Sequence, residues 1–440
     1  MKQSRRDVLR AGAGIASAGV LSSLAGCGAL PGGGGGGGLL GGGGGAYSNW
    51  LVAPGEVGLG DNYSFFSLAP ATLAESEEFS DEDTYDTLES SVEDTYSDLD
   101  LDAEDIDTAV SLGGNAASLN ANINVVVGSF TVEDLVDELE DNDYDDESEL
   151  DNGTQIFVNE SGSQAVAVNS SYAVIMARQE LTAPARDADA ANPDVRSISY
   201  GDTITSRIDD DDPDTYTNRG HHDPITFQGS EGDVVTIEMV SEDDTYLQLE
   251  DPSGTVVTQN DDYSGLDSRI DSYTLEASGE YTIIATSFSS YDTFTYRLRL
   301  TEGSGADQLV SRAETFVGVQ SGDTASYTDE SDVAADVVDA LGGGDILLAS
   351  IYEPEEEDDP ENGVLEDSVA SGLSFSENGD VFDVTGAVVY DSESDADDGD
   401  VEDWADDGTS IADGNLDDVS VSTSGRVVTF EATVDIDDLV

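Results

Sequence analysis

The chain has 440 residues, of which 97 are Asp or Glu and only 14 are Lys or Arg, so its formal net charge is −83. This length predicts two or three domains, and a hydrophobic fraction of 38% is sufficient for folded cores. The charge argues against binding of nucleic acid through its phosphates. With Lys2 as its single lysine and His221 and His222 as its only histidines, the chain lacks a P-loop and a histidine-rich zinc site.

Residues 1–26 predict an export signal. Arg5 and Arg6 lie in a basic start, an apolar segment of about 14 residues follows, and the segment ends in Leu24, Ala25, Gly26 and Cys27. This apolar segment is shorter than the roughly 20 residues of a membrane-spanning helix. The motifs resemble a twin-arginine signal followed by a lipobox, which implies export of the folded protein, cleavage before Cys27 and lipid attachment to its sulfur. An ordinary signal peptide, in which Cys27 is incidental, is the alternative.

Residues 27–46 predict a lipidated cysteine followed by a glycine-rich tether. Glycine-rich segments are flexible, and one of about 19 residues has an end-to-end distance of about 25 Å. A single lipid chain binds a membrane only reversibly, so we expect a second acyl chain or further contacts. The protein is therefore expected on the outer face of the cytoplasmic membrane.

Residues 47–186 predict the first half of an α+β domain. A polar helix is expected over 85–99, and Thr131 is expected to cap a helix over 132–139, where apolar residues recur at helical spacing. Runs of β-branched and apolar residues predict strands at 122–127, 154–158, 165–168 and 172–176.

Residues 195–303 have a different pattern from their flanks. Alternating segments at 234–240, 246–250, 281–285 and 294–300 are separated by turns rich in Gly, Asp, Pro and Ser. Short strands at this spacing, without a helical segment between them, predict an antiparallel β-sandwich.

The same residues closely resemble the bacterial pre-peptidase C-terminal (PPC) domain. The landmarks, in order, are Asp223-Pro224-Ile225-Thr226-Phe227, Glu231-Gly232-Asp233-Val234-Val235-Thr236-Ile237, Asp244-Thr245-Tyr246-Leu247-Gln248-Leu249, Asp251-Pro252-Ser253-Gly254, Ser278-Gly279-Glu280-Tyr281 and Tyr296-Arg297-Leu298. The resemblance implies a jelly-roll-type sandwich that acts as a non-catalytic binding or accessory module. Collagen-binding relatives use exposed tyrosines as binding anchors, but most of the tyrosines here fall on alternating strand positions and are expected in the core.

Some members of this family bind calcium, and calcium is the only metal that the resemblance suggests. The carboxylates of the matching loops are those of Asp209, Asp210, Asp212, Asp214, Asp223, Asp244, Asp261 and Asp262. Calcium takes six to eight oxygen ligands, and these loops could meet at one end of a sandwich. The alternative is that they are solvated surface carboxylates, because acidic loops occur throughout the chain.

Residues 308–440 predict the second half of the α+β domain. A helix capped by Ser331 is expected to end at Leu341, and a strand is expected over 346–350. A hairpin over 419–430 resembles the strands at 156–168, across a Ser-Gly turn in both cases. We therefore expect a pseudo-duplicated α+β domain with the all-β sandwich inserted between its halves, and three domains in a row as the alternative. The acidic run 391–402 lacks the glycine of an EF-hand loop and is expected to be a solvated loop.

Four N-x-[ST] sequons indicate possible glycosylation in an exported protein. Their asparagines are Asn62, Asn152, Asn159 and Asn169. Four sequons are not far above chance in a chain so rich in Ser and Thr.

The acid excess, the preference for Asp over Glu and the near-absence of Lys resemble the proteins of halophilic archaea. The main hypothesis is a non-catalytic, lipid-anchored surface protein whose sandwich binds a cell-surface protein or glycan. A secreted hydrolase with an unrecognised catalytic part is the alternative, although no catalytic motif is visible. A substrate-binding lipoprotein is less favoured, because the flanks lack a long alternating βα pattern.

Overall fold

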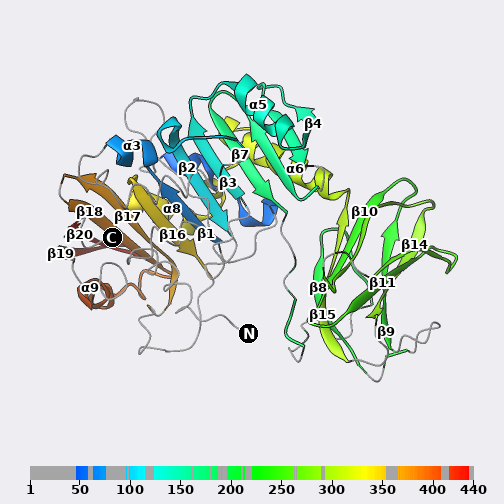
Figure 1. Ribbon diagram of the computed structural model, residues 1–440. Coiled ribbons are helices and arrows are strands. Elements are labelled where there is room, and N and C mark those ends of the chain that lie inside the picture. The colour runs from blue at the N-terminus through cyan, green and yellow to red at the C-terminus, as the bar shows by residue number, and fades with distance from the viewer. Residues whose placement is uncertain are drawn as a thin grey trace. The chain divides into compact units, whose positions relative to one another are not determined.

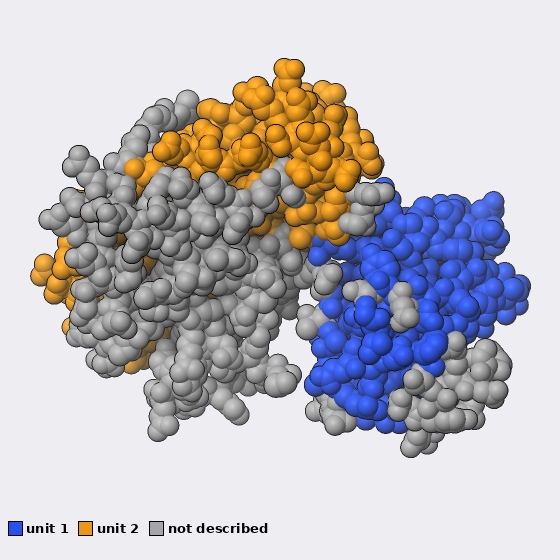
Figure 2. Space-filling view, in the orientation of Figure 1, with its two compact units in different colours: residues 1, 178–309 blue, residues 2–177, 310–440 orange. Residues whose placement is uncertain are grey.

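The computed structural model of the protein describes residues 46–57, 63–75, 96, 99–113, 123–159, 162–178, 181, 183–186, 190, 196–209, 212–213, 221–261, 263, 265–288, 293–352, 365, 367–379, 381–407 and 416–435. It contains two compact units (Figures 1 and 2). Unit 1 spans Arg178–Leu309, and unit 2 is formed by the chain on either side of it. The expected export signal and tether lie outside the described residues.

Unit 2 is built on one sheet, which has 12 strands within the described residues (Figure 1). Their order is β19-β20-β18-β17-β16-β1-β2-β3-β7-β6-β5-β4, and every neighbouring pair is antiparallel. Strands of the two flanks meet in the pair β1–β16, where Tyr63 is opposite Ile351. The strands are β1 (Tyr63–Leu68), β2 (Ile106–Gly113), β3 (Ile123–Gly128), β4 (Tyr144–Glu149), β5 (Gln155–Asn159), β6 (Gln164–Val168), β7 (Tyr172–Ala177), β16 (Ile346–Ile351), β17 (Ser368–Asn378), β18 (Val381–Tyr390), β19 (Asp417–Ser424) and β20 (Val427–Asp435).

The first five strands on each side of the β1–β16 pair follow the same order, and β5 and β4 extend one side beyond them. Going outward, each side has three strands in chain order, then the last strand of its flank, then the strand before that one. A helix follows the third strand in each case, α5 (Val132–Asp141) on one side and α9 (Asp398–Asp407) on the other.

The other helices of unit 2 are short, apart from α6. They are η1 (Ala46–Trp50), η2 (Pro54–Val57), α3 (Pro70–Glu75), η3 (Ala103–Asp105), α7 (Tyr327–Glu330) and α8 (Asp332–Leu341), while α6 (Gly305–Ser321) begins in unit 1 and continues into unit 2. Helix α8 confirms the expected cap, because the Ser331 hydroxyl accepts a hydrogen bond from the Ala334 N–H at 3.2 Å. It ends at Gly342, whose φ of 64° is readily adopted only by glycine.

Three expectations need correction. Thr131 does precede α5, but its side chain makes no capping hydrogen bond, so the helix starts without that contact. The run 391–402 is not all loop, because α9 begins at Asp398; acidic side chains in a first turn favour a helix through its dipole. Helix α6 was not expected at all. The polar helix expected over 85–99 falls mostly outside the described residues.

The core of unit 2 is formed by aromatic and β-branched side chains on the sheet and its covering helices. Phe157, Phe382 and Phe430 are fully buried. Gly386 lies opposite Phe430 on the neighbouring strand, and a Cβ at this position would overlap the phenylalanine ring. Glycine here therefore creates the space that the ring fills.

Unit 1 consists of two four-stranded antiparallel sheets, β13-β10-β15-β8 and β12-β11-β14-β9 (Figure 1). Side chains of both sheets share one core, to which Ile237 and Leu298 contribute from the first and Leu247 and Ile283 from the second. The expected antiparallel β-structure is thus confirmed. The strands are β8 (Thr203–Ile208), β9 (His222–Gly229), β10 (Val234–Val240), β11 (Thr245–Glu250), β12 (Val256–Asn260), β13 (Ser268–Thr274), β14 (Gly279–Ser287) and β15 (Phe294–Glu302).

Candidate functional site: the loop end of unit 1

Four connections of unit 1 meet at one end of its sheets, which we call the loop end. The strand register requires this: Ile208 at the end of β8 pairs with Phe294 at the start of β15, and Ser287 at the end of β14 pairs with Thr245 at the start of β11. The loop end therefore comprises, within the described residues, 209, 212–213, 221, 241–244, 261, 263, 265–267, 288 and 293.

A buried carboxylate supports the loop end from inside. Asp223 is fully buried on β9, and its Oδ2 accepts hydrogen bonds from the hydroxyls of Tyr296 at 2.7 Å and Ser206 at 3.1 Å. Its Oδ1 accepts a hydrogen bond from Arg196 at 3.2 Å. Burial raises the pKa of Asp223 to about 6, and the nearby Asp212 raises it too, against the opposing effects of the Tyr296 hydrogen bond and Arg196.

The loop after β8 is tied to the same network. Arg196 also forms an ion pair with Asp212 at 3.6 Å, and the other carboxylate oxygen of Asp212 accepts from the Asp209 N–H at 2.9 Å. The carbonyl of Asp212 lies 2.8 Å from Nδ1 of His221. Because a carbonyl only accepts, this nitrogen of His221 carries the hydrogen. His221 thus acts as a loop contact, and we assign it no catalytic role.

Large apolar side chains are exposed at the loop end. Tyr263, Leu266 and Phe288 are 51%, 52% and 43% exposed. Together with Val256 at 42%, they are the exposed large hydrophobic side chains of the described chain, and all four belong to unit 1. Single exposed apolar residues are ordinary, but three on adjoining loops indicate a surface suited to binding.

Hydrogen bonds fix the backbone at two of these residues, Leu266 and Phe288. The Thr245 N–H and hydroxyl both donate to the Leu266 carbonyl at 3.0 Å, and the Phe288 N–H donates to the Asp244 carbonyl at 2.9 Å. Leu266 and Phe288 therefore flank one dipeptide at the start of β11. The ring of Phe288 also packs 6.3 Å from that of the buried Tyr246. The apolar groups are thus presented on a defined backbone.

Five of the eight expected calcium ligands lie within the described residues. Asp209, Asp212, Asp223, Asp244 and Asp261 all lie at the loop end or at its border, whereas Asp210, Asp214 and Asp262 lie outside the described residues. Among the described residues, no three acidic, histidine or cysteine side chains are grouped so that they could hold a metal ion. Asp223 is already committed to Tyr296, Ser206 and Arg196. Calcium binding stays a prediction.

Three of the four sequon asparagines lie in unit 2 and use their side chains in turns. The Asn152 carboxamide accepts from the Thr154 N–H at 3.0 Å, and that of Asn169 accepts from the Ser171 N–H at 2.8 Å. Asn159 accepts from the Ser163 N–H at 3.0 Å. Asn62 lies outside the described residues, and so do Arg5, Arg6, Leu24, Ala25, Gly26 and Cys27.

Sequence reasoning missed Leu266 and Phe288. Each stands alone among small and polar loop residues, so neither contributes to a period that would indicate a strand. A large apolar residue isolated in a polar loop is the sequence feature that could have indicated an exposed binding residue. Of the tyrosines expected in the core, Tyr246, Tyr281 and Tyr296 are buried on strands, whereas Tyr263 is half exposed. None of the helices in the described part of the chain is long and apolar enough to cross a membrane.

No protein-family model matches the chain, and neither does any curated protein. Several solved structures do. The g-type lysozyme inhibitor PliG of Aeromonas hydrophila is 10% identical, with a TM-score of 0.19, over 25% of this chain and 97% of its own. The pre-peptidase C-terminal domain of Bacillus anthracis collagenase is 16% identical, with a TM-score of 0.20, over 28% and 100%. TP0453 is 6% identical, with a TM-score of 0.30, over 89% and 94%.

Proposed function

We propose that this is a non-catalytic surface protein of a halophilic archaeon, exported folded and anchored by lipid on Cys27, whose loop end binds a cell-surface protein or glycan. The observation that carries the binding role is the position of Tyr263, Leu266 and Phe288, exposed together on loops that hydrogen bonds fix. Exposed aromatic and aliphatic anchors of this kind supply most of the affinity of a typical interface.

We further propose that residues 47–186 and 308–440 form one duplicated α+β domain and that residues 195–303 form a PPC-like sandwich inserted between its halves. The matching strand order on both sides of the β1–β16 pair supports the duplication. In this arrangement the sandwich is attached to the α+β domain at both of its ends. The tether separates both domains from the membrane.

Replacing Leu266 and Phe288 together by Ser is expected to weaken binding to cell envelopes of the source organism by at least about tenfold, because each buried apolar side chain contributes about 1.5–3 kcal/mol. The chain beginning at residue 47 would be titrated onto isolated envelopes in molar KCl. Val256→Ser is the matched control, since Val256 is equally exposed but begins β12 at the opposite end of the sheet. Unchanged binding of the double variant would refute the role of the loop end.

Replacing Cys27 by Ser is expected to move the protein from the membrane fraction into the medium, because no thiol is left to carry the lipid. Cell fractionation with detection of the protein in both fractions measures this. Wild-type protein processed at the same site is the control. If the variant stayed in the membrane fraction, the lipid anchor would be disproved, while binding by the loop end would be unaffected.

A further inference from the structure

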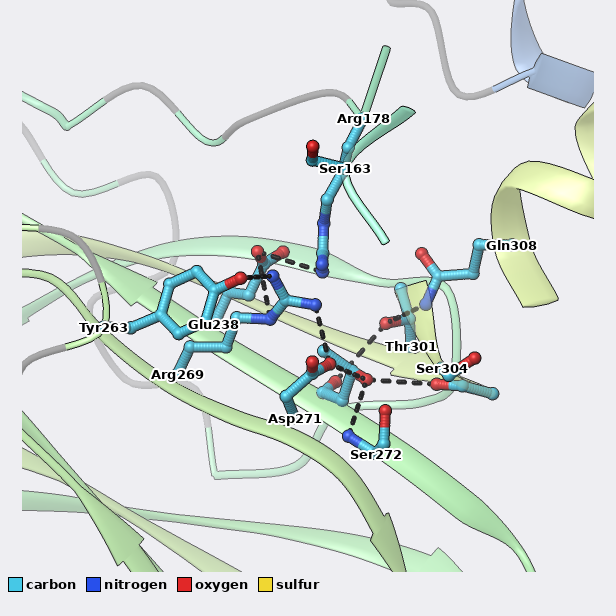
Figure 3. Close-up of polar contacts among 12 residues, drawn as sticks. Ser163, Arg178, Glu238, Tyr263, Arg269, Asp271, Ser272, Thr301, Ser304 and Gln308 are labelled. Atoms are coloured by element: carbon cyan, nitrogen blue, oxygen red, sulfur yellow. Dashed lines mark hydrogen bonds and ion pairs between the residues drawn. The ribbon is translucent and has the colours of Figure 1, made fainter. Parts of the chain in front are cut away.

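Three arginine side chains of unit 1 converge on one glutamate. Figure 3 shows two of them, Arg178 and Arg269, beside Glu238. Arg178 pairs with Oε1 of Glu238 at 3.1 Å, and Nε of Arg269 lies 3.8 Å from the same oxygen. Nε of Arg299 donates to the other carboxylate oxygen at 2.9 Å. Arg269 also pairs with Asp271 at 2.6 Å. We call this group the arginine cluster.

Strand register produces the arginine cluster. Glu238 lies on β10, between β13 and β15, and is opposite both Arg269 and Arg299. Side chains at directly opposed positions share one face, so the three project from the side of the sheet that faces away from the core. A bulge interrupts β13 at Ser272, which has a φ of 53°. Bulges re-aim side chains and are common next to binding sites.

The arginine cluster carries more positive charge than its own carboxylates neutralise. Among the described residues, three guanidinium groups of the arginine cluster pair with two carboxylates, which leaves one net positive charge on these five groups in a chain of net charge −83. Arginine is scarce here, since 14 basic residues serve the whole chain. Placing three of them together in so anionic a protein concentrates its attraction for anions at one point.

The guanidinium of Arg178 has donors to spare. Its side chain is only 9% exposed, and Nη2 contacts Glu238 as an ion pair, while Nε and Nη1 have no hydrogen-bond partner within the described chain. A guanidinium offers five N–H donors in a planar fork that matches a carboxylate. Leaving such donors unsatisfied in a buried place is costly, and oxygens of a bound anion would satisfy them.

An aromatic ring borders the arginine cluster. The central carbon of the Arg269 guanidinium lies 4.5 Å from the ring centroid of Tyr263, and the Arg269 Nη1 donates to the Tyr263 hydroxyl at 2.7 Å. Tyr263 is nevertheless half exposed. It therefore offers an apolar surface with a polar tip beside cationic donors. A sugar ring that bears a carboxylate needs both features.

The position in the sheet argues against an acidic peptide. Extended peptides bind sheets by adding a strand at an edge, where free backbone groups are available. Glu238 lies on β10, whose two sides are already paired with β13 and β15. Recognition at this point must come from side chains, which suits a sugar acid better than a strand.

We propose that Arg178, Arg269, Arg299 and Tyr263 form a binding site for a uronic-acid residue of an acidic glycan, the arginines binding its carboxylate and Tyr263 contacting its ring. This inference rests on the proposed function as a glycan-binding surface protein and names its ligand class. The −83 charge of the chain opposes an acidic ligand at low salt. In about 1 M salt the Debye length is about 3 Å, so distant repulsion is screened and contacts at hydrogen-bond distance remain.

The test is a calorimetric titration of the full protein in molar KCl with oligogalacturonate, and with a neutral galactan oligomer and polyglutamate of similar length. We expect binding of oligogalacturonate alone. Arg178→Gln and Tyr263→Ala are each expected to weaken it at least tenfold. Arg186→Gln is the matched control, because Arg186 belongs to unit 1 but pairs with Asp243 outside the arginine cluster; it should leave the affinity unchanged.

Circular dichroism of each variant checks the fold. Arg178→Gln should fold, because Glu238 keeps Arg269 and Arg299 as partners. Binding of the neutral galactan or of polyglutamate as tight as that of oligogalacturonate would overturn the proposal, and so would equal loss in Arg178→Gln and Arg186→Gln. If oligogalacturonate failed to bind while envelope binding still required Leu266 and Phe288, this inference would fall and the proposed function would stand.

Discussion

As KCl is lowered from about 3 M to about 0.1 M, unit 2 is expected to unfold before unit 1. Unit 1 holds 28 acidic residues and eight arginines, a net charge of −20, within residues 178–309. The flanks from residue 47 onward hold 68 acidic residues and only two arginines, a net charge of −66. Per residue, unit 2 is therefore much more strongly charged than unit 1.

Screening decides how much of this repulsion is felt. The Debye length grows from about 3 Å at 1 M to about 10 Å at 0.1 M salt, so carboxylates on neighbouring strands repel strongly only in dilute salt. Unit 1 is expected to stay folded to lower salt than unit 2, because ion pairs such as Arg299–Glu238 and Arg269–Asp271 offset part of its negative charge. Stabilities of folded domains are only about 5–15 kcal/mol, which repulsion on this scale can exceed.

Tryptophan fluorescence separates the two units. Both tryptophans, Trp50 and Trp404, belong to unit 2 by sequence, and Trp50 is buried with its ring 5.0 Å from that of Tyr172. Its emission should shift to the red at a higher salt concentration than the one at which circular dichroism loses the remaining strand signal. Acidifying the dilute-salt sample to about pH 4 should restore structure by protonating carboxylates. An unchanged emission down to 0.1 M would refute the prediction.

Replacing Asp223 by Ala is expected to destabilise unit 1 by about 2–4 kcal/mol, because the buried hydroxyls of Tyr296 and Ser206 would lose their acceptor. Burial raises the pKa of Tyr296 well above its ordinary value, as does the nearby Asp223, so its hydroxyl stays protonated and must donate. Asp223→Asn keeps an acceptor oxygen and is expected to lose much less.

The same carboxylate makes unit 1 sensitive to pH. The pKa of Asp223 is about 6 in the folded protein against an ordinary value of 3.8, so the folded state binds the proton more tightly than the unfolded state. Stability is therefore highest below pH 4 with respect to this group and falls by about 3 kcal/mol as pH rises through 6. At pH 5 about half of this loss is still to come.

Urea titrations in molar KCl at pH 5 and pH 8 measure the effect. Unit 1 should be about 1.5 kcal/mol less stable at pH 8 through this group, and Asp223→Asn should remove that difference. The two histidines are present in both proteins, so they do not affect the comparison. An equal pH dependence in wild type and Asp223→Asn would contradict the assignment.

Four strands of unit 1, β10, β11, β14 and β15, could be predicted because each alternates in part and ends at a turn with a strong signal, whereas β8, β12 and β13 were not expected. Val234–Val240 alternates between core and surface and was expected with the bounds that β10 has. In unit 2, β2 and β17 were not expected, because successive residues of both strands are buried and the polar–apolar alternation of a half-buried strand is missing. Helix α6 was missed because its Gly, Ser, Thr and Gln residues blur the apolar period.

The arginine cluster could not be predicted for a different reason. Arg178, Arg269 and Arg299 are far apart in sequence, and only the register of β10 with its neighbours brings the last two to Glu238. A one-residue slip would send these side chains to the opposite face. The loop end, in contrast, followed from the count of strands, because antiparallel neighbours place alternate connections at the same end.

The pairing of Tyr63 with Ile351 in the middle of the large sheet delays completion of the sheet until late in translation. When β1 leaves the ribosome, its partner β16 has not been translated, and at about 5–20 residues per second the wait is on the order of tens of seconds. During that interval β1 has no final neighbour on one side, while the sandwich strands emerge in between and can fold among themselves. Completion of the sheet thus requires a nearly finished polypeptide. A translocase that accepts only folded cargo would therefore accept this protein only after its synthesis is almost complete.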